Sequence, residues 1–424
     1  MKHMLRPTRP WQVLRPLTGL LAVLAIQGAS AQTTITVASF PDFDRAVKAA
    51  IPLYKKKNPN VEIKLVSLSY GDHHNAMTTA LATGANLPDV MAVDFGFIGK
   101  FAESGGLEDL NKAPYSGAQY RSKFTRFSYP QATNSKGALA AIPADIGPGT
   151  LFYRADMLEK AGVTQAELTK SWDSYIESGK KIKAATGAYL IPSAVDIKDI
   201  YIRSGLKDGD GIYFNKAGKA QVNTPRFQRA FELAKATRAA GLDANINAWS
   251  NEWTEAYKRE KFATQAFGAW FAGHLNNWLN TEGKGKWRSS QLPEGAFASW
   301  GGSFYAIPTK AKNKTAAWDF IRFMTLDKEM QLEAFRKLDA FPALLEAQTD
   351  PFIDQPIEYL GNQPARKLWK DAADRIAAIT VDKYDIVAKE IVDSELDNVL
   401  MKNKDIKQAL ADAQAQIEKR VRRR

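Results

Sequence analysis

The chain has 424 residues, of which 45% are hydrophobic and 25% are charged, and it contains no cysteine. This composition is that of an ordinary globular protein with two or three domain-sized cores, and it excludes disordered and collagen-like chains. The lack of cysteine excludes disulfides, thiol nucleophiles, cysteine metal sites and a lipid-bearing N-terminal cysteine.

Most of the formal net charge of +12 lies at the two ends of the chain. Basic residues gather in the first 31 residues and in the sequence KRVRRR at 419–424, whereas both signs are interspersed between them. This distribution argues against a nucleic-acid partner. The basic tail either attaches electrostatically to anionic lipid or a partner, or is a solvated helix end whose cations match the helix dipole.

The first 31 residues have the three parts of a secretory signal peptide. Lys2, Arg6, Arg9 and Arg15 precede a ten-residue apolar run at 17–26, and ASA at 29–31 supplies the cleavage site. The apolar run is too short to span a bilayer as an uncleaved anchor. We expect cleavage after Ala31 and a protein free in the periplasm of a two-membrane bacterium.

Strands alternate with helices in the first part of the chain. Strands are predicted at 34–38, 61–66 and 87–93, with helices between them at 44–57, which Pro52 should kink or restart, and at 74–82, which Gly84 can close. This β-α-β-α-β order predicts a parallel sheet with right-handed crossovers.

The second part is richer in helix. Strands are predicted at 150–153 and 301–307, and helices at 154–160, 172–184, 225–240 and 314–324. The aromatic stretch 249–287 has a helical pattern, and the chain after about residue 356 reads as helical with a break near Asn403. No long linker divides the chain, so two domains are expected to share strands that cross between them.

The sequence lacks the motifs of common enzymes. Histidine occurs only as His3, His73, His74 and His274, and no zinc-protease, serine-hydrolase, P-loop or dinucleotide motif is present. We therefore expect a protein that is not an enzyme and that uses no cofactor or metal. Paired carboxylates are abundant, so an exported glycosidase stays open as an alternative.

Six of the ten tryptophans fall between residues 249 and 300: Trp249, Trp253, Trp270, Trp278, Trp287 and Trp300. An indole offers a rigid face to the C–H groups of a sugar ring, while carboxylates accept hydrogen bonds from its hydroxyls. Most of these tryptophans are expected in the core, Trp253, Trp278 and Trp287 among them. Trp270 and Trp300 lie beside glycine, where a ligand can approach the backbone, and are the predicted ligand contacts.

Short motifs in a shared order make the chain resemble the family 1 extracellular solute-binding proteins, the maltose-binding-protein-like sugar-binding components of ABC importers. The motifs are LPDVMAVD at 87–94, AIP at 141–143, GTLFYR at 149–154, MLEKAG at 157–162, SWD at 171–173, AAGL at 239–242, WGGS at 300–303, AIP at 306–308 and AAWDFI at 316–321. Each motif is weak alone, and the resemblance covers nearly all of the chain after the leader.

The resemblance implies an α/β periplasmic-binding-protein fold with two lobes, hinge-crossing strands and a helical C-terminal segment. The expected units are a signal peptide at 1–31, an N-terminal lobe at 32–145 plus 303–338, and a C-terminal lobe at 146–302 plus 339–424. A monomer would clamp a mono- to oligosaccharide between the lobes and deliver it to the membrane permease subunits of the importer. A same-fold binder of a non-sugar solute, such as a cationic amine, is the alternative.

The resemblance also places the site on loops that follow the strands, in line with the general behaviour of open parallel sheets. The implied ligand-binding residues are Phe40, Asp42, Asp44, Tyr70, Asp72, His73, Asp94, Asp145, Trp270, Trp300, Gly301 and Gly302. Three points stay open. Asp42 and Asp44 could instead cap a helix, His73 could be exposed to solvent, and Asp145 could replace an acid that relatives carry where this chain has Gly147.

Overall fold

The structure is a computed structural model that describes residues 32–422, so the signal peptide and its cleavage after Ala31 lie outside the described residues. Its first half contains three parallel strands, with β1 paired to β2 on one side and β3 on the other. The predicted parallel β-α-β-α-β unit is therefore confirmed. The elements are β1 (Thr33–Ser39), α1 (Phe43–Lys57), β2 (Val61–Ser67), α2 (Tyr70–Thr83), β3 (Val90–Asp94), α3 (Phe95–Ala102) and α4 (Ser128–Gln131).

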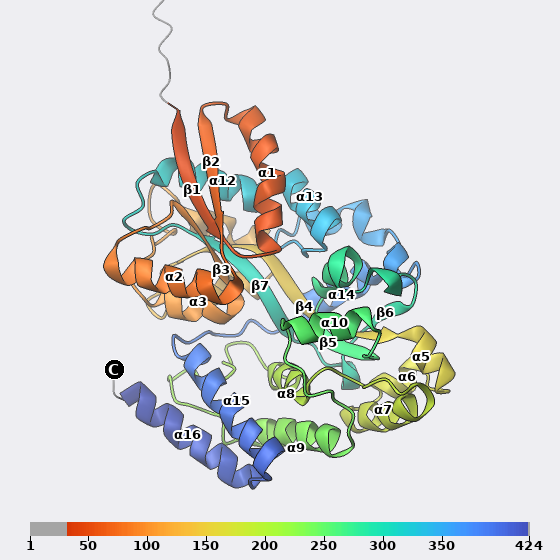
Figure 1. The fold of residues 1–424 in the computed structure, drawn as a ribbon. Coiled ribbons are helices and arrows are strands. Elements are labelled where there is room, and N and C mark those ends of the chain that lie inside the picture. Colours follow the sequence, from red (N-terminus) through yellow and green to blue (C-terminus); the bar gives the residue numbers. More distant parts are fainter. Residues whose placement is uncertain (1–31, 423–424) are drawn as a thin grey trace, which may run out of the picture.

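Two long strands run between the halves of the molecule (Figure 1). The start of β4 (Ile142–Arg154) pairs with β7 (Ser299–Ala306), and its end pairs with β5 (Thr264–Gly268) and β6 (Trp287–Ser290). The strand order is β2-β1-β3-β7-β4-β5, with β6 beside β4. Both halves are thus built on one continuous sheet. We refer to the half around β1–β3 as the first lobe and to the half around β5 and β6 as the second lobe.

Helices cover both lobes. In Figure 1, α12 (Lys314–Leu326) and α13 (Lys328–Leu338) lie beside α1 in the first lobe. The helices of the second lobe are α5 (Ala155–Lys160), α6 (Gln165–Thr169), α7 (Trp172–Thr186), α8 (Ala194–Arg203), α9 (Pro225–Ala239), α10 (Asn251–Lys258), α11 (Phe271–His274), α14 (Ala365–Arg375), α15 (Asp385–Lys402) and α16 (Ile406–Arg422). Within residues 32–422, no helix combines the length and apolar character needed to cross a membrane.

Helix ends follow local signals in the sequence. Gly84 ends α2 in the left-handed conformation, with φ of 74°, as its lack of a side chain allows. Asn403 takes the same conformation after α15 and separates it from α16, at the predicted break. Pro52 lies inside α1, which continues through it from Phe43 to Lys57, so the predicted restart does not occur.

The helical reading of residues 249–287 is wrong in part. The helical parts are α10, α11, a π-helix at Leu275–Leu279 and a 3-10 helix at Thr281–Gly283, all of them short. The strand β5 lies in the same stretch, and β6 begins at its last residue. All five residues of β5 are buried. A short strand buried on both faces shows no alternation of polar and apolar residues, so periodicity cannot distinguish it from a buried helix.

β4 and β7 approach unusually closely where they cross between the lobes. The pairing is irregular on either side of Ile146, between Pro143 and Asp145 and again between Ile146 and Pro148. A Cβ atom on Gly147 would lie 1.9 Å from the carbonyl oxygen of Trp300. Glycine is therefore required at this position, and an acidic side chain has no room there.

A buried carboxylate in α8 gives a prediction about stability and pH. Burial raises the pKa of Asp196 to about 7, while its carboxylate accepts a hydrogen bond from Gln265. The folded protein therefore holds a proton that the unfolded chain releases near its ordinary pKa of 3.8. The stability from this group is full below that pH and is lost as the pH rises towards 7.

We expect Asp196→Asn to remove this dependence. The free energy of unfolding of the variant, relative to that of the wild type, should rise by about 3 kcal/mol between pH 4.5 and pH 8. Urea unfolding at the two pH values measures this difference. An identical stability difference at both pH values would contradict the expectation.

Candidate ligand-binding cleft

A rigid hydrogen-bond network fixes Asp94 at the end of β3. Its Oδ1 accepts hydrogen bonds from the hydroxyl of Tyr70 at 2.7 Å and from the backbone N–H of Gly96 at 2.8 Å. His74 lies between them, with Nδ1 2.8 Å from the Tyr70 carbonyl and Nε2 3.2 Å from the Asp94 backbone nitrogen. Burial lowers the pKa of His74 to about 4. A neutral ring that donates from Nδ1 and accepts at Nε2 satisfies both contacts.

Asp145 lies on β4 where the strand passes between the lobes. Its Oδ1 accepts a hydrogen bond from the backbone N–H of Ser303 on β7 at 2.6 Å. Burial raises the pKa of Asp145 to about 6. Gly301 and Gly302 precede Ser303 with φ of 90° and 119°, values that side chains rarely adopt. The two glycines therefore let β7 come close to Asp145.

A row of aromatic rings lines the second lobe, and we call Trp249, Trp270, Phe267 and Trp300 the aromatic row. Consecutive ring centroids are 5.9, 5.4 and 5.6 Å apart in that order. The indole N–H of Trp270 donates a hydrogen bond to the carbonyl oxygen of Trp300 at 2.8 Å. Trp270 and Trp300 are half-buried, whereas Trp249 is 55% exposed. The row thus offers its most open face at the Trp249 end.

Arg203, the last residue of α8, extends the aromatic row at its other end. Its guanidinium lies 4.2 Å over the ring of Trp300, a cation–π contact. Nη1 donates to the backbone oxygen of Asp199 at 2.7 Å, and Nε is buried without a partner. Burial raises the pKa of Asp94 while the charge of Arg203 opposes this rise. A cation of the second lobe is therefore close enough to act on the acid of the first.

A second polar contact joins the lobes near Trp249. Nε2 of His274 lies 2.8 Å from Oδ2 of Asp42, which follows β1. Burial alone would raise the pKa of Asp42, but the hydrogen bond and charge of His274 outweigh it and lower that pKa. Asp42 also has a left-handed backbone, with φ of 68°. The two lobes therefore meet through Asp42 and His274 at one end of the aromatic row, and at the other end the charge of Arg203 acts on Asp94.

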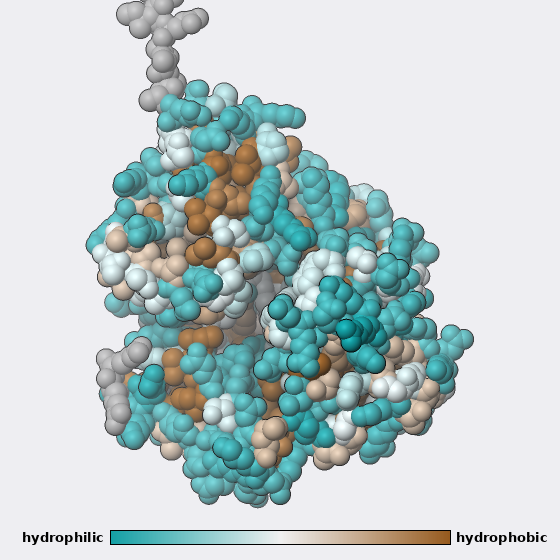
Figure 2. Space-filling view, in the orientation of Figure 1, coloured by the Kyte–Doolittle hydropathy of each residue, from teal (hydrophilic) through white to brown (hydrophobic). Residues whose placement is uncertain are grey.

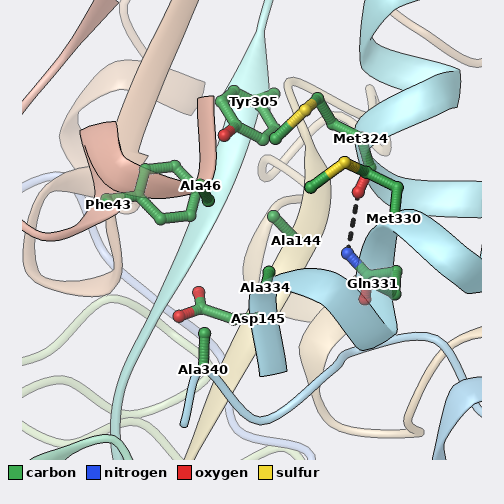
Figure 3. A pocket seen from close by; sticks show the side chains of 10 residues that line it. All are labelled: Phe43, Ala46, Ala144, Asp145, Tyr305, Met324, Met330, Gln331, Ala334 and Ala340. Carbon is green, nitrogen blue, oxygen red and sulfur yellow. Dashed lines mark hydrogen bonds between the residues drawn. The ribbon is translucent and has the colours of Figure 1, made fainter. Parts of the chain in front are cut away.

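The enclosed cavity beside Asp145 is not this site. It has a volume of about 20 Å³, and Figure 3 shows that it lies between Asp145, Tyr305 and the methionines of α12 and α13. That volume holds about one water molecule. The space-filling view in Figure 2 instead shows the surface hollowed between the two lobes. Among the described residues, no cluster of His, Asp and Glu is arranged to hold a metal ion.

A family model describes most of the chain. The model of the bacterial extracellular solute-binding proteins matches residues 38–331. The chain belongs to this family. As an extracellular solute-binding protein it is a binding protein and not an enzyme, which confirms the expectation drawn from the missing catalytic motifs.

Relatives of this solute-binding protein match along most of their length. A lactose-binding protein of Rhizobium radiobacter is 27% identical over 83% of each chain. An arabinooligosaccharide-binding protein of Bacillus subtilis is 24% identical over 70% of each chain. A crystal structure of a family 1 extracellular solute-binding protein is 25% identical, with a TM-score of 0.78 over 91% of this chain and 99% of the other. The predicted periplasmic-binding-protein fold is confirmed.

The solute-binding protein places its predicted site residues in different surroundings. Asp94, Asp145, Trp270, Trp300 and Asp42 have the contacts described above. Tyr70 is bonded to Asp94, and Gly301 and Gly302 precede Ser303, which is bonded to Asp145. Trp300 already carries Arg203 over its ring and Phe267 stacked against it. A sugar ring can stack on Trp300 only if one of these partners moves.

The other predicted residues have partners of their own. His73 is 1% exposed and its Nε2 lies 2.8 Å from the Ala92 carbonyl, so the alternative of a solvent-exposed histidine is wrong. Phe40 is buried among the rings of Phe43, Tyr70, His73 and His74. Asp44 is buried and pairs with Lys48, and Asp72 is exposed and bonded to Ser69. Asp42 occupies the N-cap position of α1 without a capping hydrogen bond from its side chain.

Proposed function

We propose that this protein is the sugar-binding component of an ABC importer, which captures its ligand outside the cytoplasmic membrane. The observation that supports this most directly is the aromatic row of the second lobe, which faces fixed carboxylates of the first lobe. Indoles suit the C–H faces of a sugar, and carboxylates suit its hydroxyls. The lactose- and arabinooligosaccharide-binding relatives support the same ligand class.

The charges of the cleft favour a neutral sugar over a cationic amine. Asp42 is paired with His274. Asp94 already accepts two hydrogen bonds, and the charge of Arg203 lowers its pKa. The ring of Trp300 carries a guanidinium where an ammonium ligand would rest. An added cation would therefore meet like charge, whereas a polyol could use both the acceptors of Asp94 and the donors of Arg203.

Capture proceeds by hinge closure in this proposal. Ligand contacts to both lobes shift the population towards the closed form, which docks on the membrane permease subunits. β4 and β7 carry the hinge, with lobe boundaries at 145/146, 302/303 and 338/339. The ligand contacts are Asp94, Asp145, Trp270 and Trp300, with Trp249 and Arg203 added to them. The mature protein is a monomer, free in the periplasm after cleavage behind Ala31.

Titration of the mature protein with candidate solutes tests this proposal. Tryptophan fluorescence should change on addition of a mono- or oligosaccharide, and native mass spectrometry should detect a co-purified sugar. Spermidine and putrescine should give no saturable change. Saturable binding of an amine, with no response to any saccharide, would contradict the proposal.

A further inference from the structure

We infer that the ligand contains at least two sugar rings and that the outer ring rests on Trp249. This inference rests on the proposed function and adds the length of the ligand, which neither the family nor the proposed function determines. It is carried by the exposure and backbone of Trp249, by the polar groups beside it, and by the length of the aromatic row.

Trp249 is held in the open by a strained backbone. It is 55% exposed, whereas Trp253, four residues later, is completely buried. Its φ of 70° is unfavourable for a bulky side chain. Such strain persists where the surrounding structure imposes it, and it is typical of ligand sites. An exposed indole on a strained backbone does not contribute to the packing of the core.

Neighbouring rings fix the indole of Trp249. The centroids of Trp253, Trp270 and His274 lie 5.0, 5.9 and 5.4 Å from its own. A platform fixed in advance loses little conformational entropy when a sugar stacks on it. Its uncovered surface is therefore prepared for a flat apolar partner.

Polar groups stand beside this platform. The Asp42 carboxylate lies 2.8 Å from the ring nitrogen of His274, and Arg45 lies 3.4 Å from the same carboxylate. These side chains provide hydrogen-bond acceptors and donors next to an aromatic face. The outer end of the cleft thus combines an aromatic face with polar groups, as the inner end does, where Arg203 lies over Trp300 and its charge acts on Asp94.

The two ends are too far apart for one ring. Phe267 connects Trp249 to Trp300, with its ring centroid 6.2 Å from that of Trp249 and 5.6 Å from that of Trp300, and the guanidinium of Arg203 lies 4.2 Å over the Trp300 ring. A single hexose that contacts Asp94 and Arg203 would leave Trp249 uncovered. A ligand that uses both polar pairs must therefore be a disaccharide or longer.

Calorimetric titration with matched pairs of sugars tests the inference. The pairs are galactose with lactose, glucose with maltotriose, and arabinose with arabinotriose. For the best-bound pair, the wild type should bind the longer sugar at least tenfold more tightly than the single ring. Trp249→Ala should weaken binding of the longer sugar at least tenfold more than binding of the single ring, and so abolish this preference. Alanine suffers a similar backbone strain at φ of 70°, so the comparison isolates the ring.

Trp249→Phe provides the matched control, because it keeps an aromatic face and should retain most of the preference. Equal wild-type affinities for the single ring and the longer sugar would overturn the inference while leaving sugar binding intact. An unchanged preference in Trp249→Ala would overturn it as well. Failure of the wild type to bind any of the six sugars would defeat the proposed function itself, and the inference with it.

Discussion

Replacement of Gly147 by alanine is expected to lower the free energy of unfolding by about 3 kcal/mol or more, at the upper end of the effects of overpacking. The added methyl group would lie 1.9 Å from the carbonyl oxygen and 2.6 Å from the carbonyl carbon of Trp300. Both atoms belong to the backbone of β7, so no side-chain rotation relieves the clash. β4 and β7 must separate where they carry the hinge.

Gly71→Ala is the matched control for this change. Gly71 lies in the first turn of α2, and a Cβ atom there meets no other atom within 4 Å. Alanine in a helix should leave stability unchanged or raise it slightly. Chemical unfolding of the two variants beside the wild type measures the difference. Equal stability of both variants would contradict the prediction, because β4 and β7 would then separate at little cost in free energy.

Replacement of Trp270 by alanine is expected to weaken sugar binding by at least tenfold. Trp270 contacts three members of the site at once, since it lies beside Trp249, stacks on Phe267 and donates a hydrogen bond to the Trp300 carbonyl. Its loss would remove an indole from the cleft and the hydrogen bond that holds the Trp300 carbonyl. Fluorescence or calorimetric titration with the best-bound sugar measures the change.

Two further variants interpret that result. Trp278→Ala removes another half-buried indole of the same lobe, outside the aromatic row, and should bind sugar as the wild type does. Trp270→Phe keeps a ring but loses the N–H donor, so its affinity should fall between those of the wild type and Trp270→Ala. An unchanged affinity in a folded Trp270→Ala protein would remove this residue from the proposed site.

The sheet of the first lobe could be predicted because its signals are local. Short β-rich runs alternate with helices there, and Gly84 and Asn403 end helices through their own backbone preferences. β5 and β6 were missed because five or fewer buried residues carry no periodicity. The requirement for glycine at position 147 could not be predicted from local sequence patterns either, because it arises from contact with a strand more than 150 residues away.

The predicted cleft residues carried local signals, either a place at or on a predicted strand or, for Trp270 and Trp300, a neighbouring glycine. Asp94 ends β3 and Asp145 lies on β4, so their positions follow from the order of the elements. Arg203 ends a helix with an ordinary basic residue, and only the folded chain brings it over Trp300. Trp249 did carry a signal, because it opens the tryptophan-rich stretch, but its exposure depends on a left-handed backbone that sequence patterns do not reveal.

The passage of β4 and β7 between the lobes restricts how this protein can be divided. The chain enters the second lobe through β4, returns through β7, and leaves the first lobe again after α13 (Figure 1). α14 and α16 then pack with the second lobe, while α15 contacts both α9 of that lobe and α3 of the first. A cut between β4 and β7 therefore separates strands that pair with each other, and a gene truncated before the end of β7 at Ala306 would encode an incomplete sheet. Reporter domains for a biosensor therefore belong in surface loops, where both crossing strands stay intact.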